Sequence, residues 1–272
     1  MTQKNSLRVL YIGDVMGKPG RTVVKALLPD ILGTYSPDLV IAQAENVSHG
    51  KGMSPAHYRE LQDMGVQVFT GGNHTTERPA TKPLLEDPSE PVLAPANQPG
   101  VEREWGVKEV QTKHGVVQVI SLLGTIFPHI AAHMENPLRT VDDILESTPG
   151  PYIARIVNFH GDWSSEKRVI GYYLDGKVSA VIGDHWHVPT ADAMVFPGGT
   201  AHITDVGMVG TLHSSLGVST QTIIDRWRDG AANKNDMASE PPYQFNAVFI
   251  TIDTKTGQAR SIEPVQKIVA TL

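Results

Sequence analysis

Short runs of β-branched and aliphatic residues recur along the chain, many of them ending at Gly, Asn or His, which is the pattern of β-strands. The runs predicted as strands are residues 7–12, 38–42, 66–70, 116–122, 152–159, 178–182 and 247–252. Between the first three runs, residues 21–32 and 55–64 are predicted helices, and the second has Ser54 as its N-cap and Pro55 at its first position. The chain therefore begins strand, helix, strand, helix, strand.

Strands dominate the prediction from residue 106 onward. Residues 113–115 are predicted to turn a hairpin between 105–112 and 116–122. Residues 86–100, rich in proline and acidic residues, and residues 230–242 are predicted surface loops. Without a repeat or a flexible linker, residues 1–272 are expected to form a single domain. An α/β start followed by a β-rich end indicates two packed sheets with helices outside, in the α/β (α+β) class.

Composition narrows the classes of function. The chain has 272 residues, 40% of them hydrophobic, and a net charge of −6, which lacks the basic excess of proteins that grip nucleic acid strongly. It contains no cysteine, so any metal ligands are nitrogen and oxygen. No apolar run approaches the roughly 20 residues that span a bilayer, and the start lacks a signal-peptide pattern. We therefore expect a cytoplasmic protein with no membrane partner.

Polar side chains follow the first three predicted strands. Asp14 follows the run 9–12, Glu45 and Asn46 follow 39–42, and Asn73 follows 66–70. A carboxylate such as Glu45 can bridge two metal ions at the separation of about 3.5–4 Å that two-metal phosphoryl chemistry uses. Each position alone also fits a helix cap or a turn. Three in succession favour a metal site.

Histidines follow the later strands in the same way. His160 follows the run 152–159, and His185 and His187 follow 178–182. Residues two apart in extended backbone point the same way, so His185 and His187 are predicted to face one site. His74, next to Asn73, is a candidate proton donor, and His49 is a candidate for lining a substrate cleft.

This set of carboxylate, amide and imidazole donors suits two divalent metal ions, with Mn, Fe and Zn all acceptable, and it points to phosphoester hydrolysis. The His185–His187 spacing also occurs in metal-dependent amidohydrolases. There it lies on the first strand of an eight-fold barrel, whereas here too little chain follows it.

Together these motifs resemble the calcineurin-like metallophosphoesterases, and within them the YmdB-like phosphodiesterases, in which Glu-Asn replaces a second Asp. The resemblance extends to about residue 226. It is carried by Ile12-Gly13-Asp14-Val15, Ala44-Glu45-Asn46, Gly72-Asn73-His74, Phe159-His160, and residues 165–167, 188–192 and 204–208.

The resemblance implies a four-layer αββα sandwich, in which two packed mixed sheets are flanked by helices, and a dinuclear iron or manganese centre. One metal would be held by Asp14, Glu45, Asn46 and His187, and the second by Glu45, Asn73, His160 and His185. A hydroxide would attack phosphorus, and His74 would protonate the departing ribose oxygen. The implied substrates are cyclic nucleotides, above all 2′,3′-cyclic phosphodiesters.

Several positions depart from the family pattern without replacing a proposed ligand. Asp184 and Trp186 stand where relatives have Thr, residues 161–163 replace Ala-Glu-Ala, Thr76 replaces an aromatic residue, and Thr125 replaces an Arg. Two other functions stay open: a phosphomonoesterase on the same centre, and a regulatory protein with a structural metal site and an RNA or protein partner. A homo-oligomer is compatible with the sequence.

Overall fold

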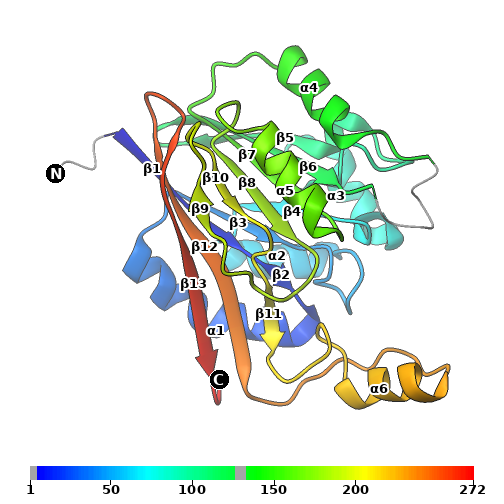
Figure 1. Ribbon diagram of the computed structural model, residues 1–272. Coiled ribbons are helices and arrows are strands. Elements are labelled where there is room, and N and C mark those ends of the chain that lie inside the picture. Colours follow the sequence, from blue (N-terminus) through cyan, green and yellow to red (C-terminus); the bar gives the residue numbers. More distant parts are fainter. Residues whose placement is uncertain (1–4, 126–132) are drawn as a thin grey trace.

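The chain folds into two mixed β-sheets that pack face to face, with helices on both outer sides (Figure 1). The computed structural model describes residues 5–125 and 133–272. This is the αββα sandwich predicted above. None of the helices in the described part of the chain is long and apolar enough to cross a bilayer.

The first sheet has seven strands among the described residues. In spatial order they are β2 (Asp14–Val15), β11 (Met208–Thr211), β12 (Tyr243–Asp253), β1 (Ser6–Ile12), β3 (Leu39–Gln43) and β4 (Val68–Thr70), and β13 (Ala259–Val269) pairs with β12. β1, β3 and β4 are parallel, whereas β12 runs antiparallel to β1. The carboxyl ends of β1, β3 and β4 therefore lie at one edge.

The second sheet has six strands among the described residues. Their order is β5 (Val107–Thr112), β6 (Gly115–Leu123), β7 (Ala154–His160), β8 (Ala180–Asp184), β10 (Ala201–Ile203) and β9 (Met194–Val195). β6, β7, β8 and β10 are parallel. The predicted hairpin is confirmed, since β5 and β6 pair antiparallel up to Thr112 and Gly115.

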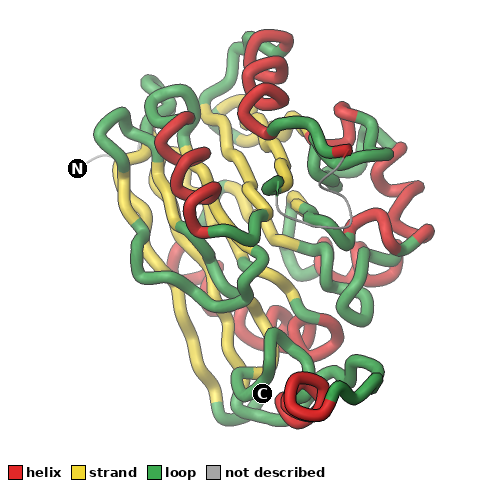
Figure 2. Tube along the Cα trace, turned by 45° about the vertical axis from the view of Figure 1, so that its right-hand side comes forward, coloured by secondary structure: helices red, strands yellow, loops and turns green. Residues whose placement is uncertain are grey.

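Successive side chains along a strand point to opposite faces of its sheet, so each strand contributes to the core between the sheets and to the core under the helices. On β1, Leu7, Val9 and Tyr11 face the core between the sheets, while Leu10 and Ile12 face the helices. The helices on the first sheet are α1 (Gly17–Tyr35), α2 (Pro55–Asp63) and α3 (Lys82–Glu86), and those on the second are α4 (Pro137–Ser147) and α5 (Ser164–Tyr173). Figure 2 shows these helices outside the strands. The predicted Ser54 cap is confirmed, because Ser54 accepts from the His57 backbone N–H.

The prediction that strands dominate from residue 106 onward is confirmed, because the described part of this region contains nine strands and three α-helices, namely α4, α5 and α6 (Thr220–Asp229). The structure corrects one loop prediction. Residues 86–100 are not simply a surface loop, because residues 92–98 are buried and the Leu93 N–H donates to the Phe69 carbonyl. The acidic residues that suggested a loop lie before this buried stretch, whereas Pro95 lies within it. Residues 230–242 do form a largely exposed loop.

Candidate metal centre

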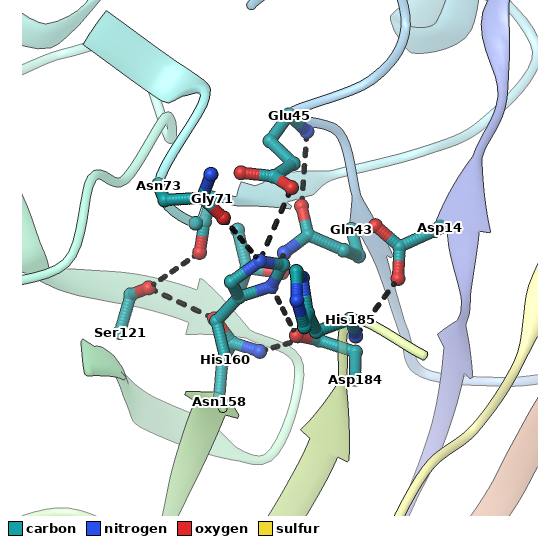
Figure 3. Close-up of polar contacts among 12 residues, drawn as sticks. Asp14, Gln43, Glu45, Gly71, Asn73, Ser121, Asn158, His160, Asp184 and His185 are labelled. Carbon is teal, nitrogen blue, oxygen red and sulfur yellow. Dashed lines mark hydrogen bonds and ion pairs between the residues drawn. The ribbon is translucent and has the colours of Figure 1, made fainter. Parts of the chain in front are cut away.

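The carboxyl ends of parallel strands from both sheets meet at one place, where the predicted donors gather. Asp14 follows β1, Asn73 follows β4, His160 ends β7 and His185 follows β8. Glu45 and Asn46 come shortly after β3. Figure 3 shows Glu45, Asn73, His160 and His185 pointing toward one another, with Asp14 beside them.

One group of donors surrounds the ring of His160. Its Nε2 lies 3.2 Å from Oε1 of Glu45 and 3.0 Å from Oδ1 of Asn73. Ligand atoms of Glu45, His160 and His185 all lie within 4.8 Å of one another. Ligands that bind one ion at about 2.0–2.2 Å are themselves about 3–4 Å apart, so this group has the dimensions of a metal site.

A second group lies against the first. Nδ2 of Asn46 is 3.1 Å from Oδ1 of Asp14 and 3.3 Å from Nε2 of His187. That Nδ2 is also 3.3 Å from Oε1 of Glu45, so this carboxylate belongs to both groups. To ligate an ion, Asn46 would rotate its amide by half a turn, which exchanges two nearly equivalent atoms. The seven predicted ligands therefore form two adjoining groups.

The loop that carries His185 and His187 is not extended, contrary to the prediction. Both residues have positive φ angles, 101° and 62°, which are uncommon for residues other than glycine. The carboxylate of Asp205 holds this turn by accepting the Trp186 backbone N–H at 2.8 Å. The turn sends His185 to the first group and His187 to the second. Both imidazoles still reach the centre, but for a different geometric reason.

Gly72 leaves room for the donors. A Cβ at this position would lie 2.4 Å from the His160 ring and 2.5 Å from Oε2 of Glu45. Thr75 fixes the turn, because its Oγ1 accepts the Gly72 N–H at 2.8 Å. Glycine is therefore required where the β4 loop passes the centre.

Residues behind the donors orient them. The Nδ1–H of His187 donates to the Leu216 carbonyl at 3.1 Å, so Nε2 presents its lone pair to the second group. On the other side, Nδ1 of His160 lies 2.7 Å from the buried carboxylate of Asp184, which also accepts from Asn158 and, at 3.2 Å, from Tyr11. Asp184, first noted only as a departure from the family pattern, thus contacts a proposed ligand.

Sequence reasoning missed this supporting layer, although a signal was present. Asp184 shares the inward face of β8 with Ala180 and Ile182, and Asn158 shares that of β7 with Ile156. A polar side chain at the end of an inward-facing apolar stripe needs a partner. That rule would have pointed to both residues.

Burial and charge set the protonation of the histidines. Burial lowers the pKa of His185 to about 2, with the charge of His160 adding to the effect. Burial likewise lowers the pKa of His187 to about 4. Both are therefore neutral near pH 7, which is the form that binds metals. Burial alone would lower the pKa of His160, but Glu45 and Asp184 raise it well above its usual value.

The pKa values of the carboxylates Asp14 and Glu45 shift in opposite directions. Burial raises the pKa of Asp14 well above its usual value, and the neighbouring charge of Asp184 adds to this. Burial would also raise the pKa of Glu45, but the positive charge of His160 outweighs it and the net shift is downward. A bound cation would offset the cost of keeping these buried carboxylates charged.

A buried ion pair supports the loop that carries His185 and His187. Nζ of Lys167 on α5 lies 2.7 Å from Oδ2 of Asp205 and 2.7 Å from the Asp184 carbonyl oxygen. It also sits 4.1 Å from the centre of the Trp186 ring. Both charged side chains are fully buried. Lys167 therefore links the helix to the loop that carries the two histidines.

Hydrogen bonds connect most of the remaining departures, directly or through Glu166. Glu166 accepts the backbone N–H groups of Thr125 at 2.9 Å and Asp162 at 3.1 Å. The Trp186 indole N–H donates to the Asp162 carbonyl at 2.7 Å. Thr76 accepts from Gln98 at 3.2 Å. The replaced residues at positions 125, 161–163 and 186 thus form one connected set beside the centre.

The two candidate histidines outside the ligand groups are placed differently. The His74 backbone N–H donates to Oε2 of Glu45 at 2.7 Å, which holds His74 at the edge of the centre. His49 is exposed and lines a surface pocket with Lys18, Met237 and Tyr243. Among the described residues that line this pocket there is no proposed ligand. The structure thus brings His74 to the donors and leaves His49 outside them.

Comparisons with known proteins find relatives that match nearly the whole chain. A family model described as YmdB-like protein matches residues 10–265. A curated protein of Bacillus subtilis (strain 168), named 2′,3′-cyclic-nucleotide 2′-phosphodiesterase, is 36% identical over 259 residues, which cover 94% of this chain and 96% of that protein.

Two solved structures have the same fold. A hypothetical protein from Thermus thermophilus superposes with a TM-score of 0.87 at 36% identity, covering 97% of this chain and 100% of that one. A phosphatase from Mycoplasma pneumoniae gives a TM-score of 0.89 at 30% identity, covering 97% of this chain and 94% of that one. The similarity therefore extends over nearly the whole chain.

Proposed function

Because the chain belongs to the YmdB-like protein family, we propose that it is a metal-dependent phosphodiesterase that hydrolyses cyclic nucleotides, with 2′,3′-cyclic phosphodiesters as the preferred class. The observation that carries the proposal is the convergence of ligand atoms from Glu45, His160 and His185 within 4.8 Å. The name of the B. subtilis relative supports the substrate class.

The cofactors of this proposal are two divalent ions, Mn or Fe, with Zn also compatible with the donors. Asp14, Glu45, Asn46 and His187 would hold one ion, and Glu45, Asn73, His160 and His185 the other. The donor spacing fits, since Nε2 of His160 lies 3.0 Å and 3.2 Å from the oxygens of Asn73 and Glu45. Two bound ions would lower the pKa of a water molecule and offset the charge of the phosphate.

The side chains of this chain supply orientation and a proton. Asp184 and the Leu216 carbonyl hold His160 and His187 with Nε2 toward the centre. His74, anchored through its backbone to Glu45 at 2.7 Å, is the proposed general acid. It would donate a proton to the ribose oxygen as the bond from that oxygen to phosphorus breaks.

Hydrolysis of 2′,3′-cyclic adenosine monophosphate by the Mn-reconstituted protein tests the proposal. The variants Asp14→Asn and His74→Ala should be assayed beside the wild type, with bound Mn measured in each. We expect turnover in the wild type, loss of Mn in Asp14→Asn, and retention of Mn with a fall of about 10²–10⁴-fold in His74→Ala. A wild type that binds two ions and hydrolyses nothing would refute the proposal.

A phosphomonoesterase on the same centre is the second candidate, because the M. pneumoniae structure of similar fold is that of a phosphatase. Rates on a cyclic diester and on the corresponding nucleoside monophosphate separate the two. Faster release of inorganic phosphate from the monoester than ring opening of the diester would favour this alternative.

A further inference from the structure

Glu77 joins His74 to Lys51. Its Oε1 lies 2.5 Å from Nδ1 of His74, and its Oε2 lies 2.5 Å from Nζ of Lys51. His74 is the N-cap of the 3₁₀ helix η2 (Thr75–Glu77), so the two residues are three positions apart. Side chains at this spacing eclipse each other in a 3₁₀ helix, which places the carboxylate directly against the imidazole.

We propose that Glu77 is a positioning residue for His74, an inference that rests on the proposed function. A carboxylate oxygen only accepts, so Nδ1 of His74 must carry the hydrogen of this bond. The proton that leaves is then the one on Nε2. It moves to the ribose oxygen as that oxygen takes the electron pair of its breaking bond to phosphorus, while the oxygen of a hydroxide ion forms the new bond to phosphorus. His74 ends neutral, still held at Nδ1.

The second oxygen of Glu77 also has a partner, Lys51. Lys51 holds it from the turn that follows Asn46, and the guanidinium of Arg78 ties the same turn by donating to the carbonyls of Ser48 at 2.8 Å and Lys51 at 3.0 Å. Burial would raise the pKa of Glu77, but the hydrogen bonds from Lys51 and His74 lower it, so it stays a carboxylate. Lys51 and Arg78 thereby join the two loops that carry Asn46 and Asn73.

An ordinary surface ion pair would stabilise the fold without affecting proton transfer. The side chains of His74 and Glu77 are 29% and 39% exposed, so this alternative has to be tested. The two roles differ in how they depend on the leaving group. A ribose alkoxide needs a proton to depart, whereas p-nitrophenolate, a weak base, departs without one.

The experiment compares Glu77→Gln, Glu77→Asp and His74→Ala with the wild type on two diesters, 2′,3′-cyclic adenosine monophosphate and bis(p-nitrophenyl) phosphate. For Glu77→Gln we expect kcat on the cyclic nucleotide to fall about 10–100-fold, a part of the effect of losing the acid itself. Turnover of the p-nitrophenyl diester and bound Mn should stay within about 2-fold, and Glu77→Asp should recover part of the loss. Glu86→Gln is the matched control, because Glu86 forms an exposed ion pair with Lys82 at 3.4 Å on the neighbouring helix α3.

The outcomes distinguish failure of the proposed role of Glu77 from failure of the proposed role of His74. If Glu77→Gln slows both diesters equally, or neither, while His74→Ala slows only the cyclic nucleotide, this inference is wrong and the proposed function stands. If His74→Ala shows no such selectivity, the role of His74 fails and the inference with it. The double variant should be no slower than His74→Ala alone, because Glu77 acts only through His74. An additive loss would also overturn the inference.

Discussion

Oδ1 of Asp184 lies 2.7 Å from Nδ1 of His160, and both side chains are fully buried. Because a carboxylate only accepts, this contact places a ring hydrogen on Nδ1 and leaves Nε2, the atom that faces Glu45 and Asn73, as the nitrogen that could bind a metal ion. Asp184 therefore positions the ring hydrogen of a proposed metal ligand.

The variant Asp184→Asn should weaken metal binding by about 10–100-fold, the range found when a ligand loses its orienting partner. Competitive Mn titration measures the affinity, and Asp143→Asn, which alters an exposed ion pair on α4, is the control. Unchanged affinity would mean that the contact with Asp184 does not orient His160 for metal binding.

The substitution Gly72→Ala should disrupt the centre while leaving the fold intact. Its Cβ would lie 2.4 Å from the His160 ring, so the β4 loop or the ring must move. We expect bound Mn and turnover to be lost and the circular dichroism spectrum to be retained. Gly33→Ala is the control, since nothing lies within 4 Å of a Cβ in that helical position. Full Mn occupancy in Gly72→Ala would contradict the proposed ligand positions.

Removing one partner of the buried ion pair should destabilise the protein strongly. Lys167→Met leaves Asp205 buried without its cation, which is expected to lower the free energy of unfolding by about 3–5 kcal/mol. Urea denaturation measures this loss. Lys82→Met, which breaks an exposed pair, should change it by less than about 1 kcal/mol. Equal effects of the two variants would argue against a structural role for Lys167.

His202 should make the protein acid-sensitive. Burial lowers its pKa from the usual 6.5 to about 4 in the folded state. Between these values the unfolded chain binds a proton that the folded chain does not, so stability falls as pH drops from 6.5 toward 4 and is unaffected above 6.5. The loss at pH 5 is about 2 kcal/mol.

The variant His202→Gln should remove that part of the acid sensitivity. Unfolding free energies at pH 7.5 and pH 5 measure it, and His213→Gln, at an exposed position, is the control. If His202→Gln and the wild type lose the same stability between the two pH values, another buried group is responsible.

Much of this fold can be predicted from the sequence alone. The strand runs, the Ser54 cap and the hairpin near residue 114 depend on local patterns, namely alternation, a capping hydroxyl and a turn, and the structure confirms them. The candidate donors could also be named, because each closely follows an apolar strand. The exposed and buried parts of residues 86–100 could not be separated, because burial there depends on a neighbouring strand.

The sequence by itself determined which residues are available: a cysteine-free set of carboxylates, amides and imidazoles at strand ends. Only the tertiary structure decided which of them meet. Contact between Glu45 and His160 requires that β3 and β7, in different sheets, end at the same place. The contacts of Asp184 with His160 and of Lys167 with Trp186 likewise depend on the tertiary structure. The order and facing of strands arise from long-range packing of the two sheets, so no local pattern records them.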